Sequence, residues 1–582
     1  MIFLNINLIT ILSVFTSILI ICTFTRKFLT CKGIQIILLF TNFLLLIYCT
    51  LYWNYYVTKY QVDFFSLVLN PNTWTNVTYE INFKINCLSF LFIFLVSIIG
   101  FATNIYILNY FKYEEREEEF VLLINWFILS MIVLVSGNNF FTLILGWELV
   151  GLTSFLLINF WKYKAITLNY SFKAFTFNKF SDLLLMISFC ILWNIYKIND
   201  IDTLLSVINS NSQYSNNYLT LSAICLLMSG SIKSAQLFGH LWLPDSMEAP
   251  VPASSLIHSA TLVSAGIYLI LKFQTIYFIT NLSDIIFFLG SITACYGGIV
   301  AASQSDVKKL LAYSTISHCG FIVTTISLNN FLVTTVYLYL HGLFKAVTFF
   351  CVGSLIKYNN TQDMRLMGML KFQILNILFL IISSTNLGGL PFTVGYMYKE
   401  LYITLLSITN FNFISYGFCI MGLLSSVVYT YKLIYYSCFD FRKGSIQTQI
   451  LYLQNYRKLF NNILLNFTYI KFFAFFTIYI YTIFFFIIVK YYILNLYFFF
   501  GHLPENSFNE LKYLGNFLYL KKYLISLFYV LFTIICLVLI LNSNRTNYFF
   551  TQKFNILTQL LLLLIALSII NFFLKYLLYL II

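Results

Sequence analysis

Residues 230–252 read GSIKSAQLFGHLWLPDSMEAPVP, with two glycines and three prolines in or beside an otherwise apolar run. Residues 386–400, NLGGLPFTVGYMYKE, again combine glycines and a proline with a lysine inside an apolar segment. Irregular backbone at membrane depth is tolerated only where it is buried in protein or lines water. Paired interruptions of this kind predict two discontinuous helices in an inverted-repeat membrane fold. The plainer interpretation is two helix ends whose lysines reach toward the interface.

The composition of the whole chain indicates a membrane protein. Of its 582 residues, 60% are hydrophobic and 9% are charged, and the mean hydropathy is +0.85. A soluble domain carries roughly 25% charged residues, so an ordinary soluble enzyme is excluded. Apolar runs of about 20 residues, each long enough to cross a bilayer, recur along the chain without the alternation of barrel strands. The sequence therefore predicts an all-α polytopic membrane protein with about 14–16 transmembrane helices.

The predicted spans follow one another through most of the chain. They lie at 3–22, 33–52, 84–108, 120–136, 138–159, 172–195, 218–241, 252–273, 283–302, 307–327, 331–356, 371–405 and 411–436. Less regular apolar segments follow at 470–500, 521–541 and 555–581.

The net charge of +14 does not point to nucleic acid. The basic residues are spread through the connections and the C-terminal third, as is usual beside membrane-spanning segments, and no basic stripe is present. We expect membrane lipids around this chain, and no nucleic acid.

Cysteine usage and the N-terminus bear on cofactors and location. The twelve cysteines include no Cys-x-x-Cys pair, so the sequence predicts no metal site, iron–sulfur cluster or disulfide framework. Residues 1–22 are apolar, without a basic leader or a small-residue cleavage site, and are predicted to be a retained first span. The many Phe (64) and Tyr (44) residues use A/T-rich codons, which favours an organelle genome.

A few ionisable residues lie inside the predicted spans, and we refer to them together as the row. Each costs at least about 2.5–3.5 kcal/mol at the membrane centre. Glu148 lies in NNFFTLILGWELVGLTSFLLI, with apolar sequence on both sides. A buried carboxylate takes up a proton unless a cation lies nearby, and Lys233 is the candidate cation. Asp182 follows Lys179 by three residues on one helical face. It is either a further member of this row or the partner of Lys179 in a local structural ion pair.

Histidines and lysines continue the row in the second half of the chain. His258 lies in SSLIHSATLVSAG. It is interpreted either as a hydrogen-bonded core residue or as a proton shuttle, since its unperturbed pKa is near neutrality. His341 and Lys345 are four residues apart in YLYLHGLFKAVTFF and share a helix face, and Lys399 follows the second interruption. A lysine in a low-dielectric site can exchange its proton reversibly. Such groups, spread over several spans, favour a proton relay over a single binding pocket.

Other polar residues have plainer interpretations. In SQSDVKKLLAYSTISHCG, Asp306 is predicted to cap a helix, and Lys308 and Lys309 are predicted to be interface charges. His318, later in the same helix, remains without an assigned role.

Six stretches, in order, resemble a known family. They are GWELVGLTSFLLI, LWLPDSMEAPVPASSLIHSATLVSAGIYLI, DVKKLLAYSTISHCGF, HGLFKAVTFFCVGSLI, DMRLMGML and GLPFTVGYMYKE. They are similar to the chain 5 family of NADH–ubiquinone oxidoreductase, the distal antiporter-like subunits of respiratory complex I. The resemblance covers about residues 80–405, and the WLPDSMEAP and LIHSATLV motifs separate it from chains 2 and 4. Mrp-type cation/proton antiporter subunits carry a similar block and are the alternative.

The resemblance implies two inverted five-helix repeats, each with a half-channel, joined by a central polar axis. It implies N-terminal helices at 1–110, repeats at 111–275 and 276–437, and C-terminal helices at 438–582. Residues 555–581 are then either a lateral helix or the final anchoring span.

The resemblance also implies a role for each residue of the row. Glu148 and Lys233 form the pair of the first repeat, and Asp182 matches a further acid of the family. His258 links the two halves. The path continues through three residues of the second repeat, His341, Lys345 and Lys399.

Electron transfer would then belong to other subunits. The resemblance implies a subunit of a proton-translocating NADH:ubiquinone reductase without its own redox centre, because FMN, iron–sulfur clusters and quinone belong to its partners. The expected partners are other membrane-arm subunits, above all the adjacent chain 4. The expected location is the mitochondrial inner membrane, with a bacterial plasma membrane as the alternative.

Two residues depart from the family pattern. Lys179 stands where arginine is usual, which keeps the charge but loses the planar fork. Tyr337 stands where some members have a further histidine, four residues before His341, so the resemblance supplies no relay residue at this position. A third hypothesis, a structural membrane scaffold, predicts that the row can be removed without loss of proton pumping.

Overall fold

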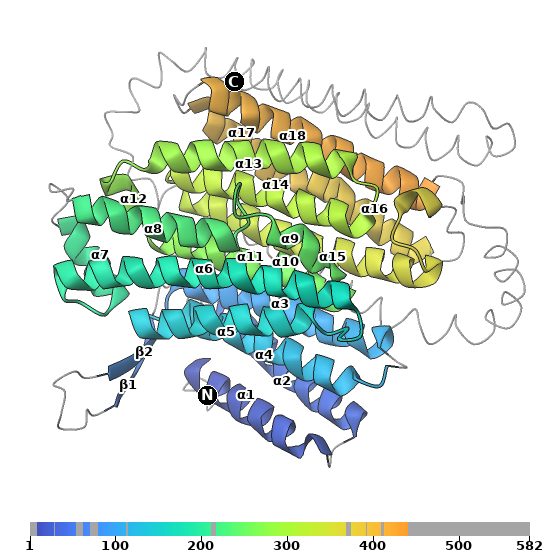
Figure 1. Cartoon of the computed structure of the whole chain (residues 1–582), viewed down its shortest axis with the longest axis horizontal. Helices are drawn as coiled ribbons and strands as arrows, with labels where there is room; N and C mark the ends of the chain where they lie inside the picture. Colours follow the sequence, from blue (N-terminus) through green and yellow to red (C-terminus); the bar gives the residue numbers. More distant parts are fainter. Residues whose placement is uncertain are drawn as a thin grey trace, which may run out of the picture.

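The computed structural model describes residues 8–27, 30–53, 62–69, 79–111, 114–210, 217–367, 374–390, 393–408 and 413–439. In this part the chain forms a helical bundle, with α1 at one edge and α18 at the opposite edge (Figure 1). The apolar segments predicted at 470–500, 521–541 and 555–581 lie outside the described residues.

The part of the chain that the structure describes contains eighteen α-helices, which follow one another in chain order. They are α1 (Leu8–Phe24), α2 (Cys31–Leu51), α3 (Cys87–Tyr110), α4 (Glu117–Ser136), α5 (Phe140–Ile158), α6 (Ala165–Tyr196), α7 (Ile201–Ser210), α8 (Asn217–Lys233), α9 (Trp242–Asp245), α10 (Val251–Ser259), α11 (Leu262–Lys272), α12 (Gln274–Ile279), α13 (Ser283–Ser303), α14 (Val307–Ser327), α15 (Phe331–Asn359), α16 (Ile374–Gly388), α17 (Val394–Ile408) and α18 (Phe413–Ile434). Short helical turns are η2 (Thr25–Lys27), η4 (Ser246–Glu248), η5 (Met364–Leu366) and η6 (Tyr435–Phe439).

The predicted fold class is confirmed. Within the described residues, ten helical segments are long and apolar enough to cross a membrane, with α10 and α11 counted as one. The predicted total of about 14–16 spans includes segments outside the described residues. The predicted boundaries after residues 110, 275 and 437 remain predictions.

A two-stranded sheet is the one departure from the helical prediction in the described part of the chain. β1 (Asp63–Leu69) and β2 (Tyr79–Ile85) pair antiparallel and project from one end of the bundle (Figure 1). Lys84 binds Asp202 at 2.5 Å, which ties the hairpin to α7. The predicted span at 84–108 therefore begins after the hairpin, at Cys87.

The first predicted interruption is confirmed. α8 ends at Lys233, and the chain then turns through residues 234–241 before α9, η4 and α10. Ala235 (φ 53°) and Phe238 (φ 72°) adopt left-handed backbone, which a continuous helix does not contain. The Trp242 indole N–H donates to the Ile232 carbonyl at 3.0 Å and so satisfies one of the carbonyls that the ending helix leaves free.

The second predicted interruption is also confirmed, and it divides the segment 371–405 into α16 and α17. Gly389 follows α16 with a positive φ of 69°, the usual way for a helix to end. The Asn386 side-chain oxygen accepts a hydrogen bond from the Gly395 N–H at 3.0 Å, which joins the two half-helices.

The span predicted at 252–273 is present as Val251–Lys272, but its helix contains a third interruption, which the sequence did not predict. α10 ends at Ser259 and α11 begins at Leu262. The Thr261 hydroxyl donates to the Leu256 carbonyl at 3.0 Å, and side-chain bonds of this kind compete with the helical ladder. Residues 259–262 contain no proline, and the nearest glycine, Gly266, lies inside α11, so the usual sequence signals of a break are absent here.

The core of the bundle surrounds these interruptions. Every residue from Val251 to Leu271 is buried inside the chain. α8 and α11 approach closely at Gly230 and Gly266, where a Cβ on Gly266 would come 2.5 Å from the Gly230 carbonyl oxygen. This close packing positions the end of α8, and with it Lys233, away from both lipid and bulk water.

Candidate functional site

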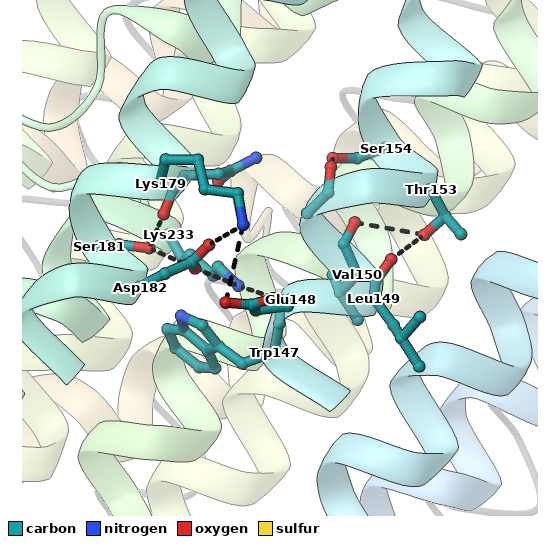
Figure 2. A network of polar contacts seen from close by, with 12 residues as sticks. Trp147, Glu148, Leu149, Val150, Thr153, Ser154, Lys179, Ser181, Asp182 and Lys233 are labelled. Carbon is teal, nitrogen blue, oxygen red and sulfur yellow. Dashed lines mark hydrogen bonds and ion pairs between the residues drawn. The ribbon is translucent and has the colours of Figure 1, made fainter. Parts of the chain in front are cut away.

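The first cluster of the row surrounds the end of α8. Lys233 is fully buried, and its Nζ donates to the Trp147 carbonyl at 2.7 Å and lies 3.9 Å from the centroid of the Trp147 ring. The acid nearest to it is Asp182 on α6, with 3.7 Å between Lys233 Nζ and Asp182 Oδ1. Figure 2 shows these three residues converging from α5, α6 and α8.

Lys179 joins the two acids of this cluster. Its Nζ lies 3.4 Å from Asp182 Oδ2 and 3.7 Å from Glu148 Oε1 (Figure 2). Asp182 is almost fully buried, whereas the side chains of Glu148 and Lys179 are 41% and 46% exposed. The order of contacts is therefore Glu148, Lys179, Asp182, Lys233, with each distance short enough for an ion pair.

This order corrects the predicted direct pair of Glu148 and Lys233. Among the described residues, no ion pair joins those two side chains, and Asp182 takes the place assigned to Glu148. Consecutive residues on a helix point about 100° apart, so when Trp147 faces Lys233, Glu148 faces α6. The local Lys179–Asp182 pair does exist, but Asp182 also binds Lys233 and so belongs to the row.

The exposed side of this cluster opens into a groove along α6. The groove encloses about 460 Å³, with Glu148, Lys179 and Asp182 among its lining residues. The rest of its lining is mostly apolar and comprises Leu183, Met186, Ile187, Cys190, Ile191 and Asn194. A charged acid and base thus lie at the surface of an otherwise apolar flank.

His258 lies between the two halves of the row. It is 1% exposed, and its Nε2 is 3.2 Å from the Ser246 hydroxyl in η4. Its ring stacks on Phe349 of α15, with 5.9 Å between centroids, and its Nδ1 is buried without a hydrogen-bond partner. His258 therefore contacts both the first interruption and the helix that carries Lys345.

His341 and Lys345 lie one turn apart on α15, as the spacing predicts. Lys345 is fully buried, and its Nζ donates to the Leu311 carbonyl at 3.2 Å and to the Ser314 hydroxyl. In the described part of the chain, no carboxylate lies within ion-pair distance of Lys345. His341 is 3% exposed, and its Nε2 is buried without a hydrogen-bond partner.

Lys399 lies on α17, directly after the second interruption. It is fully buried, and its Nζ donates to the carbonyl of Gly388, the last residue of α16, at 2.8 Å. It also donates to the Ser426 hydroxyl of α18 at 2.7 Å. A cation at the C-terminal end of a half-helix is favoured by the unsatisfied carbonyls and by the helix dipole.

Sequence reasoning misassigned Lys308. It is not an interface charge, because it is 6% exposed and its Nζ donates to the Met247 and Ala249 carbonyls, each at 3.1 Å. Asp306 precedes α14 at the N-cap position, but its side chain makes no capping bond and instead lies 3.6 Å from Lys309. When a lysine lies in the polar first turn of a helix, the sequence does not show whether it is buried against carbonyls or exposed at the membrane interface.

His318 of α14 is the residue of the site that the sequence left without a role. It is fully buried, and its ring centroid lies 4.8 Å from that of His341. Its two ring nitrogens contact the hydroxyls of Tyr337, at 3.0 Å, and Tyr429, at 2.9 Å. These contacts come from α15 and α18, far apart in the sequence, so only the folded chain brings them together.

Comparison with known proteins gives two results. A profile of the family described as "NADH:quinone oxidoreductase/Mrp antiporter, TM" matches residues 137–426. NADH-ubiquinone oxidoreductase chain 5 of Paramecium tetraurelia is 40% identical over 426 residues, which covers 70% of this chain and 75% of the relative. The same-named chain of Wickerhamomyces canadensis is 34% identical, covering 70% of this chain and 63% of the relative. That of Patiria pectinifera is 33% identical, covering 65% and 58%.

Solved structures share the fold at lower identity. A chain of the Mrp complex from a Dietzia species superposes with a TM-score of 0.65 at 22% identity, covering 74% of this chain and 47% of that one. A chain of the membrane-bound sulfane sulfur reductase, an archaeal respiratory membrane complex, gives 0.64 at 15% identity, covering 77% and 93%. At these identities the likeness concerns the fold alone.

Proposed function

The chain belongs to the NADH–ubiquinone oxidoreductase chain 5 family, and from this premise we propose that it is a proton-translocating membrane subunit of respiratory complex I. The observation that supports this most is the complete burial of Lys233, Lys345 and Lys399 in membrane-depth helices. Each of these lysines donates to at least one main-chain carbonyl. Burial makes the charged form costly, so small changes around each amine can drive uptake or release of its proton.

In the first repeat, the proposed switch is the competition of two lysines for Asp182. Lys233 and Lys179 lie on either side of this carboxylate, at 3.7 and 3.4 Å. When Lys179 moves toward Glu148, Asp182 is free to stabilise the charged Lys233. When Lys179 moves toward Asp182, the charged Lys233 loses stabilisation and passes its proton on toward His258.

In the second repeat, the proposed path continues through His341 and Lys345 to Lys399. The hydrogen bonds described for Lys345 and Lys399 go to neutral carbonyls and hydroxyls, which accept from the charged amine. The seven residues proposed to carry protons are thus Glu148, Asp182, Lys233, His258, His341, Lys345 and Lys399.

We further propose that electron transfer takes place in partner subunits. FMN, iron–sulfur clusters and quinone would be held there, and this chain would supply only binding and movement of protons. The proposed location is the mitochondrial inner membrane.

The proposed neighbour is the adjacent antiporter-like chain 4, at the flank formed by α5 and α6. Glu148 and Lys179 are half exposed there, and a charge facing lipid costs at least about 2.5–3.5 kcal/mol. A protein partner with polar groups at that depth would remove this cost.

The test is the replacement of Lys345 by methionine in the assembled complex. In sealed membrane vesicles, we expect Lys345→Met to lower the number of protons pumped per NADH oxidised, because methionine fills the site but cannot hold a proton. Lys357→Met is the matched control, since Lys357 lies on the same helix but is exposed and donates to the Tyr110 carbonyl. Normal pumping by an assembled Lys345→Met complex would instead favour a structural scaffold.

The alternative, an Mrp-type cation/proton antiporter subunit, predicts a different result. Purified vesicles would then exchange Na⁺ for protons without NADH, and the chain would purify without flavin-bearing partners. Co-purification with flavin and iron–sulfur subunits supports the complex I proposal.

A further inference from the structure

His318 occupies the junction between the His341–Lys345 side of the row and the Lys399 side. It extends from α14, while His341 lies on α15 and Lys399 on α17. Its ring lies against that of His341, and its contact with Tyr429 leads to α18, the helix that also carries Ser426, a hydrogen-bond partner of Lys399.

Each nitrogen of the His318 ring lies within hydrogen-bond distance of a tyrosine hydroxyl. Nδ1 is 3.0 Å from the Tyr337 hydroxyl of α15, and Nε2 is 2.9 Å from the Tyr429 hydroxyl of α18. The Tyr429 hydroxyl also lies 3.4 Å from Ser317 Oγ. Ser426, which accepts from Lys399, precedes Tyr429 by three residues and so shares its face of α18.

We propose that His318 is itself a proton-carrying group of the second repeat, linking His341 to the Lys399 side through the Tyr337 and Tyr429 hydroxyls. This inference rests on the proposed function of the chain as a proton-translocating subunit. It adds to the row a member from α14, a helix that supplies none of the seven residues above.

The transfer balances without any further reactant. A neutral imidazole carries one N–H, accepts a proton on its other nitrogen, and then releases the first proton, which leaves the neutral ring in its other tautomer. Each tyrosine hydroxyl likewise accepts one proton and donates its own. No electron or covalent bond other than the N–H and O–H bonds changes.

The geometry also distinguishes this role from a simple packing role. A packing residue would need no second titratable ring in contact, yet the rings of His318 and His341 lie 4.8 Å apart at an angle of 34°. His341 Nε2 is buried without a hydrogen-bond partner, so it keeps a free position for a proton or a bridging water.

The test replaces His318 by glutamine in the complete chain within its complex, and measures protons pumped per NADH oxidised. Glutamine can keep hydrogen bonds to both tyrosines but cannot carry a proton. We expect His318→Gln to remove the same share of pumping as Lys345→Met, while NADH oxidation in uncoupled vesicles is retained. If His318→Gln does not assemble, His318→Asn serves in its place.

The decisive experiment asks whether a second substitution restores the proton pumping that His318→Gln removes. Tyr337 touches His318 and lies one turn before His341, so the double variant H318Q/Y337H returns an imidazole to the same junction from α15. We expect this second change to restore the lost pumping. Failure of the rescue, with the double variant assembled, would overturn a proton-carrying role, since a lost packing contact also explains the single variant.

Two further variants separate this inference from the function on which it rests. His240→Gln is the matched control, because His240 contacts only the Tyr296 hydroxyl, at 3.2 Å, among the hydrogen bonds described here for its side chain. It should pump normally. Normal pumping by His318→Gln together with loss in Lys345→Met refutes the inference alone, whereas normal pumping by Lys345→Met refutes the proposed function.

Discussion

Asp182, rather than Glu148, is the acid that contacts Lys233. The Lys233 amine is enclosed by the Trp147 ring, the Trp147 carbonyl and one oxygen of Asp182. The ring and the carbonyl are neutral, so Asp182 supplies the only full counter-charge among the contacts described for this amine. Glu148 contacts Lys179 instead of Lys233. We therefore expect Glu148 to affect the charge of Lys233 more weakly than Asp182 does, and only through movement of Lys179.

The first prediction compares the two acids. Asp182→Asn removes the counter-charge of a buried pair, which costs about 3–5 kcal/mol if Lys233 stays charged. We therefore expect loss of proton pumping and a less stable complex, measured by vesicle acidification and by thermal inactivation. Glu148→Gln should reduce pumping with a much smaller loss of stability. Equal destabilisation by the two variants would contradict this order of contacts.

Buried lysines at helix ends are a repeated feature of the interrupted elements. Lys399 binds the last carbonyl of α16, and Lys308 binds two carbonyls around η4. Lys432, which is only partly buried, makes a similar contact at the end of the uninterrupted helix α13, where it donates to the Ala302 and Gln304 carbonyls, each at 2.7 Å. A broken helix leaves carbonyls without partners, and an ammonium group with three donors can satisfy two of them at once.

The second prediction concerns Lys308, which we expect to support the interruption rather than carry protons. Lys308→Met leaves the Met247 and Ala249 carbonyls without this donor, at about 1–3 kcal/mol for each unsatisfied group. The complex should lose thermal stability, while the molecules that assemble should keep their ratio of protons to NADH.

Lys309→Met is the matched control for Lys308. Lys309 is the next residue, and its pair with Asp306 is 45% and 37% exposed. Exposed pairs contribute about 0–1 kcal/mol, so stability should hardly change. A drop in the pumping ratio of Lys308→Met, at normal stability, would assign Lys308 to the relay instead.

At the scale of the molecule, the described residues of α5 and α6 present a largely apolar flank on which the acid Glu148 and the base Lys179 are exposed. Large apolar side chains of α6, including Phe180, Leu183 and Met186, are exposed beside Glu148 and Lys179. A single exposed apolar residue needs no explanation in a membrane protein, but exposed charge at this depth does. We therefore expect a neighbouring subunit, and not lipid, to cover the groove.

The third prediction tests that cover. Met186→Trp adds volume inside the groove, which lipid chains would accommodate but a packed protein interface would not, at about 1–3 kcal/mol for overpacking. We expect less assembled complex on native gels. Tyr163→Trp, at a position 72% exposed before α6, should assemble normally. Full assembly of Met186→Trp would place lipid at this flank.

Sequence patterns predicted most of the elements, because the signals for them are local. Apolar runs located the helices, and Gly389 and Pro244 lie at the two interruptions that were predicted. The break at Thr261 was missed because it depends on a side-chain hydrogen bond, which leaves no glycine or proline in the sequence. The hairpin at 63–85 was missed because its register is set by pairing with another strand.

What the sequence by itself determined is that this chain crosses a membrane and that several ionisable side chains, Lys233, Lys345 and Lys399 among them, lie inside its spans. Hydropathy and charge are properties of single residues and short runs, and the cost of a buried charge makes each exception visible. Only the tertiary structure decided that Asp182 meets Lys233 and that His318 meets His341. Those contacts depend on the rotation of each helix about its axis, and one residue's difference turns a side chain by about 100°.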